Sequence, residues 1–389
     1  MPLPPFGYEG PYDVDRKKQF SAGKRRGAVQ RQGTRPAPAR IRGSSVVSAY
    51  PLNSGIGAYS LRLFELGFHE ELAMFKIVRS YPEDGFDVVL KHPLNVAGAA
   101  TFLSLYANSR WGRYASRRAS IHFTSPDWFH AAKYNPRPYG TVHDVFAIEH
   151  PEWFSARYRA YFRREMEAAA GLAGLVAVSR ATARSVRELF PDLDPIVIHN
   201  WTGPEFRPRD RGAAREALGL PRDRRIVLSV GSDLPRKNVE IVRRLAGGLP
   251  EEYAVVRLGA FAFSDRTRVE GGMGSPGRIV VRKGVPRDLV PLYYNAADVL
   301  VAPSLAEGFD LPVVEAINSG IPVVASDIDV HREIMMGRGR YADPHDPDRW
   351  IEEVQRAAEE RDPWSGIGDY YREGRAAEEY ARLYGFHST

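Results

Sequence analysis

Two glutamates, Glu307 and Glu315, stand eight positions apart around the start of a predicted helix. A buried strand at Asp298–Ala302 precedes them, and the helix is expected to begin near Pro312 and to end before Gly320. A helix start at the carboxyl end of a buried strand presents free backbone N–H groups to an anion. Ionised carboxylates only accept hydrogen bonds, so they suit the hydroxyls of a sugar or a ribose. Together these features predict a site for a sugar nucleotide.

Two adjacent bases, Arg236 and Lys237, follow another predicted strand in the same half of the chain. That strand, Arg225–Val230, is followed by Gly231 and Ser232 before the bases. At a helix start the two bases can hold a diphosphate, and the helix dipole assists them. Such a pair alone is more often a solvated helix start, so the nearby glutamates are what favour a binding role.

The first half of the chain carries a glycine loop, Gly55-Ile56-Gly57, after a predicted strand at Ser45–Tyr50. Glycines at a helix start allow a ligand to come close to the backbone. The third glycine of a dinucleotide-binding fingerprint is missing, because Ser60 takes its place. The loop is therefore a weak signal for NAD and a fair one for phosphate.

His143 and Asp144 end a predicted strand in the same half. A lone histidine is more often structural than catalytic, so this pair needs support from the rest of the site. His122 and Asp127 are fainter candidates, expected near the place where an acceptor would enter.

The run Glu307-Gly308-Phe309-Asp310-Leu311-Pro312, with Glu315, closely resembles the acidic motif of the retaining glycosyltransferases of family 4, which have the GT-B fold. The pattern points to mannosyltransferase-like members. The family usually has Gly where this chain has Asp310, which leaves the loop geometry and the choice of sugar open. Lys237 matches a family lysine, whereas Ser232 stands where many members have Arg, and Arg236 is the candidate to replace that charge.

The resemblance implies a role for each matching residue. Glu307 would hold sugar hydroxyls and Glu315 the ribose, and His143 would hydrogen-bond the transferred sugar. The implied catalytic residues are His143, Glu307, Lys237 and Arg236, and the implied donor-binding residues are Gly55, Gly57, Ser232, Gly308, Phe309, Asp310, Leu311 and Glu315.

The reaction implied by the resemblance is transfer of a hexose, of mannose or glucose type, from a nucleoside diphosphate sugar to an acceptor hydroxyl, with retention. The leaving phosphate would take the acceptor's proton, so no enzyme nucleophile is needed. Four Asp-x-Asp pairs occur, but none follows a strand that suits a nucleotide. We therefore expect a metal-independent hexosyltransferase without a cofactor. Its partners would be the sugar nucleotide and a glycan, polysaccharide or lipid-linked acceptor.

Strands and helices alternate along two stretches separated by a proline-rich, charged segment near Pro204 to Arg211. This alternation predicts an α/β protein with two Rossmann-like domains that face a central cleft. The expected parts are a tail at 1–43, an N-terminal acceptor domain at 44–204 and a C-terminal donor domain at 205–367. A last helix within 368–389 is expected to cross back onto the first domain.

Residues 1–43 contain ten Lys or Arg and three Asp or Glu, whereas the whole chain of 389 residues has a net charge of +6. The positive charge thus belongs to the tail, which we expect to be disordered. The chain has no cysteine and no apolar run that could span a membrane. These features favour a cytoplasmic protein, with peripheral membrane contact through the tail as an alternative to an inert tail. No specific nucleic-acid partner is expected, because the rest of the chain has no basic excess.

Two other functions remain open on the sequence alone. One is a non-catalytic GT-B protein that binds a sugar nucleotide without turnover. The other is an NAD-dependent Rossmann oxidoreductase or epimerase, which would need a glycine at Ser60 and an acid after the second strand.

Overall fold

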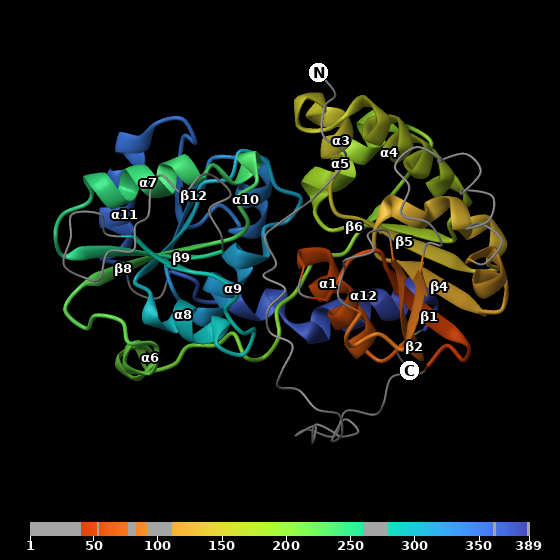
Figure 1. The fold of residues 1–389 in the computed structure, drawn as a ribbon, viewed down its shortest axis with the longest axis horizontal. Helices are drawn as coiled ribbons and strands as arrows, with labels where there is room; N and C mark the ends of the chain where they lie inside the picture. The colour runs from red at the N-terminus through yellow and green to blue at the C-terminus, as the bar shows by residue number, and fades with distance from the viewer. Residues whose placement is uncertain are drawn as a thin grey trace.

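Two parallel β-sheets with helices on both faces form the frame of the computed structural model (Figure 1). The structure describes residues 40–52, 54–76, 83–91, 111–259, 279–360 and 363–386. Nearly all of the basic tail lies outside these residues. No helix among them is long and apolar enough to cross a membrane.

The N-terminal sheet has the strand order β3-β2-β1-β4-β5-β6-β7, and every neighbouring pair is parallel. The central strands are short and fully buried, as in a parallel sheet covered on both faces, although they contain polar residues such as Ser45, His122 and Thr141. Its strands are β1 Ser44–Ser48, β2 Glu71–Lys76, β3 Val88–Lys91, β4 Ser120–Phe123, β5 Pro138–Val142, β6 Gly174–Ala177 and β7 Ile196–Val197. Its helices include α1 Gly55–Glu65, α3 Phe146–Glu149, α4 Ala156–Ala168 and α5 Arg180–Leu189.

The C-terminal sheet has the order β10-β9-β8-β11-β12-β13 and is also parallel throughout. Its strands are β8 Arg225–Val230, β9 Tyr253–Leu258, β10 Ile279–Arg282, β11 Val299–Ala302, β12 Val323–Ser326 and β13 Arg340–Ala342. Its helices include α6 Arg211–Leu218, α7 Val239–Gly248, α8 Val290–Ala296, α9 Leu311–Ser319, α10 Asp329–Ile334 and α11 Pro347–Ala357.

The order of the strands reverses between β8 and β11, which lie side by side. Ligands of open parallel sheets bind beyond the carboxyl ends of the strands at such a reversal. The loop after β8 carries the two adjacent bases, and the loop after β11 carries Glu307. The topology therefore brings the basic and the acidic motifs together.

The chain passes between the domains twice, near Thr202 and near Arg372, and the two passages form a parallel bridge there. The N–H of Thr202 donates to the carbonyl of Tyr371 at 3.1 Å. A short turn, η5 Gly368–Tyr371, then leads into α12 Glu373–Tyr384. Figure 1 shows α12, in dark blue, among the red and orange elements of the N-terminal domain.

Two tyrosines fix α12 to that domain. Tyr380 and Tyr384 are buried in one apolar cluster with residues of α1, β1 and β2. The hydroxyl of Tyr384 bonds Nδ1 of His122 at 2.8 Å, and Arg137 donates to the Tyr384 carbonyl at 2.7 Å. The last helix is thus structurally part of the first domain.

The helix predicted to start at Lys237 begins two residues later. Lys237 ends a 3₁₀ turn, η4 Pro235–Lys237, and Asn238 then takes a left-handed conformation with φ 46° before α7 starts at Val239. Asn tolerates this conformation better than most residues. Its side chain also donates to the carbonyl of Pro344 at 2.8 Å. Because of this break, Lys237 precedes the helix rather than opening it.

Candidate functional site between the two domains

Backbone from both domains meets at Gly308. A Cβ atom there would lie 1.8 Å from the carbonyl oxygen of His143, so any side chain would push the two loops apart. The hydroxyl of Thr182, at the start of α5, lies 3.3 Å from that oxygen and 3.2 Å from the carbonyl of Gly308. The structure therefore places the motif after β11 against the His143 loop after β5.

Glu307 forms ion pairs with both predicted bases. Its carboxylate lies 2.7 Å from Arg236 and 2.6 Å from Lys237, and its own side chain is 5% exposed. Burial disfavours the charged ammonium of Lys237, but the nearby carboxylates of Asp310 and Glu307 outweigh it and raise the pKa of Lys237. Arg236 also lies 5.5 Å from the ring centre of Phe146, across the domain boundary. Both bases are thus charged and stand at the interface.

Asp310 adopts a left-handed conformation, with φ 66° and ψ 72°, directly before α9. This conformation accounts for the glycine that the resembling family has here, and Asp is one of the few other residues that visit it. Its carboxylate lies 3.4 Å from Lys237 and 3.1 Å from Nε2 of His331. Burial alone would raise the pKa of Asp310, but Lys237 and His331 hold it below the ordinary value.

The geometry around His143 makes it a hydrogen-bond acceptor toward any ligand. Burial lowers the pKa of His143 to about 4, so the ring is neutral at pH 7. Its Nε2 lies 2.8 Å from the carbonyl of Thr124 and must donate to it, which leaves Nδ1 without a proton. Tyr59 packs edge-on against the ring at 4.8 Å. A sugar hydroxyl is a suitable donor to Nδ1. Burial also raises the pKa of the neighbouring Asp144, against the attraction of Arg236.

Glu315 lies on α9, where Tyr294 donates to its carboxylate at 2.7 Å and Arg62 approaches it at 3.5 Å. Burial raises the pKa of Glu315. Arg62 comes from α1 of the other domain and also donates to the carbonyl of Trp201 at 3.0 Å. Sequence reasoning missed Arg62, although it lies seven positions after Gly55 and hence on the same face of the helix.

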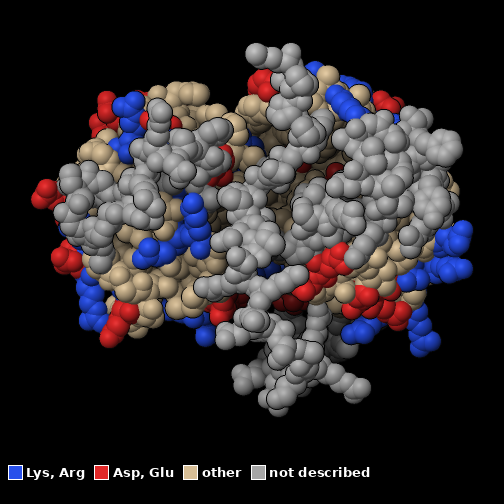
Figure 2. Space-filling model, viewed as in Figure 1, with Lys and Arg blue, Asp and Glu red and all other residues tan. Residues whose placement is uncertain are grey.

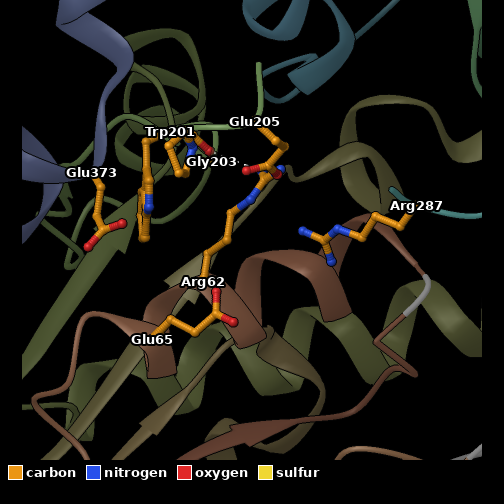
Figure 3. Close-up of a pocket in the computed structure, with 8 residues that line it drawn as sticks. Arg62, Glu65, Trp201, Gly203, Glu205, Arg287 and Glu373 are labelled. Carbon is orange, nitrogen blue, oxygen red and sulfur yellow. Dashed lines mark hydrogen bonds between the residues drawn. The ribbon is translucent and has the colours of Figure 1, made fainter. Parts of the chain in front are cut away.

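A cavity of about 80 Å³ lies beside Arg62, where the chain passes between the domains. Figure 3 shows Arg62 extending past Glu65 toward Glu205, while Arg287 points its guanidinium into the same space. Burial, followed by the charge of Arg62, lowers the pKa of Arg287. The other lining residues are Trp201, Gly203, Pro204 and Glu373.

The two glycines in the first turn of α1 serve different needs. A Cβ on Gly57 would lie 1.9 Å from the carbonyl oxygen of Pro51, whereas no atom of the described residues lies within 4 Å of one on Gly55. Ser54 caps the helix by accepting from the N–H of Gly57 at 3.0 Å. The chain's own turn therefore accounts for Gly57, whereas no contact among the described residues requires a glycine at position 55.

Arg257 holds the loop at Gly231 and Ser232, and no local sequence pattern marks it for this role. It lies on β9 with 2% of its side chain exposed, and it donates to the carbonyls of Gly231 and Ser232 at 3.1 and 3.0 Å. It also pairs with Asp233 at 3.0 Å. A buried charge on one strand thus shapes the loop that follows its neighbour.

Phe309 and Leu311 turn their side chains into the core. The ring of Phe309 lies 5.9 Å from that of Tyr371, and Leu311 packs on the same apolar cluster. The start of α9 has no side-chain cap. These two residues therefore offer a donor their backbone N–H groups only.

His122 does not belong to this interface. It is fully buried, and its ring nitrogens bond Thr141 and Tyr384, both at 2.8 Å. Among the residues that the structure describes, no three His, Asp or Glu side chains gather closely enough to hold a metal ion.

Residues 210–373 match the family model described as glycosyl transferases group 1. D-inositol 3-phosphate glycosyltransferase from Mycobacterium leprae is 35% identical over 159 residues, which are 40% of this chain and 35% of that protein. The same enzyme from Thermomonospora curvata is 33% identical over 207 residues, 47% of this chain and 48% of that protein. The chain thus spans about a third to a half of the length of these curated relatives.

Solved structures match over most of the chain. HepE from Anabaena, in complex with UDP and glucose, has a TM-score of 0.70 at 16% identity, covering 88% of this chain and 99% of its own. Sucrose-phosphate synthase from Thermosynechococcus elongatus has a TM-score of 0.68 at 18% identity, covering 88% and 98%. Both matches establish the two-domain architecture.

Proposed function

We propose that this chain, which has the GT-B fold and whose residues 210–373 form a domain of the glycosyl transferases group 1, transfers a sugar from a nucleoside diphosphate sugar to an acceptor hydroxyl. The observation that carries the proposal is the cluster of Glu307 with Arg236 and Lys237, placed against the His143 loop. The relatives named as glycosyltransferases, and a neighbour solved with UDP-glucose, support a sugar-nucleotide donor.

In this proposal the two bases bind the diphosphate and stabilise it as it leaves. Preorganised positive charge at a leaving diphosphate can replace a metal ion, because it acts where negative charge develops. The reaction is therefore metal-independent and uses no cofactor. The N–H groups at the start of α9 add to this charge through the helix dipole.

The sugar is a hexose and lies between Glu307 and His143. Glu307 accepts from its hydroxyls on one side, and Nδ1 of His143 accepts on the other. Glu315 holds the ribose. Arg62, which lies 3.5 Å from the Glu315 carboxylate, moves away when the ribose binds. The configuration at the sugar carbon is retained, with the leaving phosphate taking the acceptor's proton. The acceptor is a glycan or lipid-linked hydroxyl that enters from the N-terminal domain.

The environment of Ser60 argues against the dehydrogenase alternative. Its side chain is fully buried, and its hydroxyl bonds the carbonyl of Ile56 at 2.9 Å and Thr124 at 2.7 Å. The serine side chain thus fills the position where the dinucleotide fingerprint has a glycine so that helix and strand can pack closely.

The proposal is tested by screening UDP-, GDP- and ADP-sugars for thermal stabilisation, then for hydrolysis and transfer in EDTA. A donor at a hundred times its dissociation constant stabilises by about 2.7 kcal/mol. No stabilisation by any sugar nucleotide would overturn the proposal. Binding without turnover would identify a binding protein, and activity lost in EDTA but restored by Mg²⁺ or Mn²⁺ would overturn metal independence.

A further inference from the structure

The charged side chains at the interface form a line that continues behind Lys237 into the core. Its members are Arg236, Glu307, Lys237, Asp310 and His331. Asp310 bonds Nε2 of His331 at 3.1 Å, and Nδ1 of His331 lies 2.9 Å from the carbonyl of Ser326 at the end of β12. His331 is completely buried, whereas the side chains of Lys237 and Arg236 are 14% and 22% exposed. The line thus opens toward a ligand at its basic end only.

Both ring nitrogens of His331 face acceptors, one a carbonyl and one a carboxylate. A neutral imidazole has a single N–H, so only the imidazolium satisfies both contacts. Its helix neighbours do not compete, since Arg332 pairs with Asp327 and Glu333 contacts α5. The charged groups in line with it come from the loops after β8 and β11.

The net charge of this line determines how strongly the site attracts a diphosphate. Arg236, Lys237 and the imidazolium of His331 face the carboxylates of Glu307 and Asp310. With the imidazolium, positive charges exceed negative ones by one. With a neutral His331 the line would carry no net charge, and Lys237 would be the only cation paired with Asp310.

We propose that His331 is a positioning residue of the diphosphate site: it neutralises Asp310 and so leaves the ammonium of Lys237 to the donor. The inference rests on the proposed function, which assigns Lys237 to the diphosphate. It also explains how the chain tolerates an acid at position 310, beside an anionic ligand. His331 acts through Asp310 and does not touch the donor itself.

A double-mutant cycle tests this coupling by calorimetric titration with the sugar nucleotide that the wild type binds best among UDP-glucose, GDP-mannose and ADP-glucose. His331→Gln is expected to weaken binding roughly tenfold, or about 1.4 kcal/mol. In the Asp310→Gly background there is no carboxylate for His331 to neutralise. Asp310→Gly and Asp310→Gly/His331→Gln are therefore expected to bind the donor equally. His130→Gln breaks another histidine–carboxylate pair, in which a partly buried His130 lies 2.7 Å from the buried Glu165, and serves as the matched control.

Each failure has its own signature. If His331→Gln binds the donor like the wild type, or loses the same factor with and without Asp310, the inference is wrong while the proposed function stands. Equal loss of binding for the donor and for the bare nucleoside would show a merely structural role and also overturn it. If the wild type binds none of the three sugar nucleotides, it is the proposed function that fails.

Discussion

Lys237 touches two carboxylates at once, and this contact makes it the most informative single residue of the site. Lys237→Ala is expected to weaken donor binding by roughly 2–5 kcal/mol, because it removes the ammonium that is proposed to pair with the diphosphate in a largely buried site. The measurement is donor affinity by calorimetry together with the unfolding temperature. Lys283→Ala, an exposed lysine of the same domain, is the matched control and is expected to bind normally. Unchanged affinity in Lys237→Ala would remove the diphosphate assignment.

A second prediction at this scale concerns His69, which is 2% exposed and lies edge-on to Tyr384 at 5.0 Å. Burial lowers its pKa to about 3 from an ordinary value of 6.5. The unfolded chain therefore binds the proton more tightly, so His69 contributes stability that is complete above pH 6.5 and is lost as pH falls toward 3.

The free energy of unfolding is expected to fall between pH 7.5 and pH 5, and to fall less in His69→Phe, which keeps a ring without a titratable group. Identical slopes for His69→Phe and the wild type would contradict the burial argument.

Residue types near the donor were predictable because the motifs are local, but their partners were not. The signals for Glu307 and Lys237 lie within a few positions of a strand end. The partners Arg62 and Arg257 lie on other elements, 253 and 25 positions from the atoms they bond, and no local pattern marks them. The functional assignments of the predicted residues remain proposals.

Among the elements, the start of α5 joins the domains most directly. Glu333, on α10 of the C-terminal domain, accepts from the N–H groups of Arg180 and Ala181 at 2.7 and 3.1 Å. His199 bonds the same carboxylate at 2.6 Å. Ser179 accepts from Thr182 at 3.0 Å, so the helix start has caps from both domains. One carboxylate thereby fixes a helix that also touches Gly308 through Thr182.

Glu333→Ala is expected to cost about 1–3 kcal/mol of stability, because the buried His199 and the partly buried N–H of Ala181 lose their acceptor. It is also expected to weaken contact between the domains and so raise the donor concentration needed for half-saturation. Denaturant unfolding and donor titration measure the two effects. Glu352→Ala, on the exposed face of α11, is the control and is expected to stay within about 0.5 kcal/mol of the wild type. Equal stability of both variants would exclude a capping role.

The alternation of strands and helices could be predicted almost throughout, because buried parallel strands are short apolar runs with turn residues at their ends. The exact start of α7 could not. Asn238 leaves the helical conformation next to a contact with Pro344, which is 106 positions away. The strand order, which makes β8 and β11 neighbours, was not predicted, because it is set by pairing between segments far apart in the chain.

At the scale of the whole molecule, the predicted GT-B architecture is confirmed by the two parallel sheets and by the solved neighbours. Figure 2 shows both signs of charge scattered over the described surface of one face. The excess of basic over acidic residues therefore lies in the sequence of residues 1–43 and not in the rest of the chain.

We expect this tail to bind anionic membranes, since each Lys or Arg near such a surface contributes about 1 kcal/mol. Full-length protein is expected to sediment with phosphatidylserine vesicles at low salt and to be released as salt rises. Protein lacking residues 1–43 is expected to stay in solution, and neutral vesicles are the control. Equal sedimentation of both proteins, or sedimentation that salt does not change, would rule out an electrostatic tether.

The position of α12 also sets the order in which the molecule is completed during synthesis. Tyr380 and Tyr384 fill the apolar cluster of the first domain, yet they leave the ribosome after the whole of the second. The C-terminal sheet consists of consecutive segments from β8 to β13. It can therefore form before α12 completes the core of the N-terminal domain. The half of the protein that is synthesised first is therefore finished last.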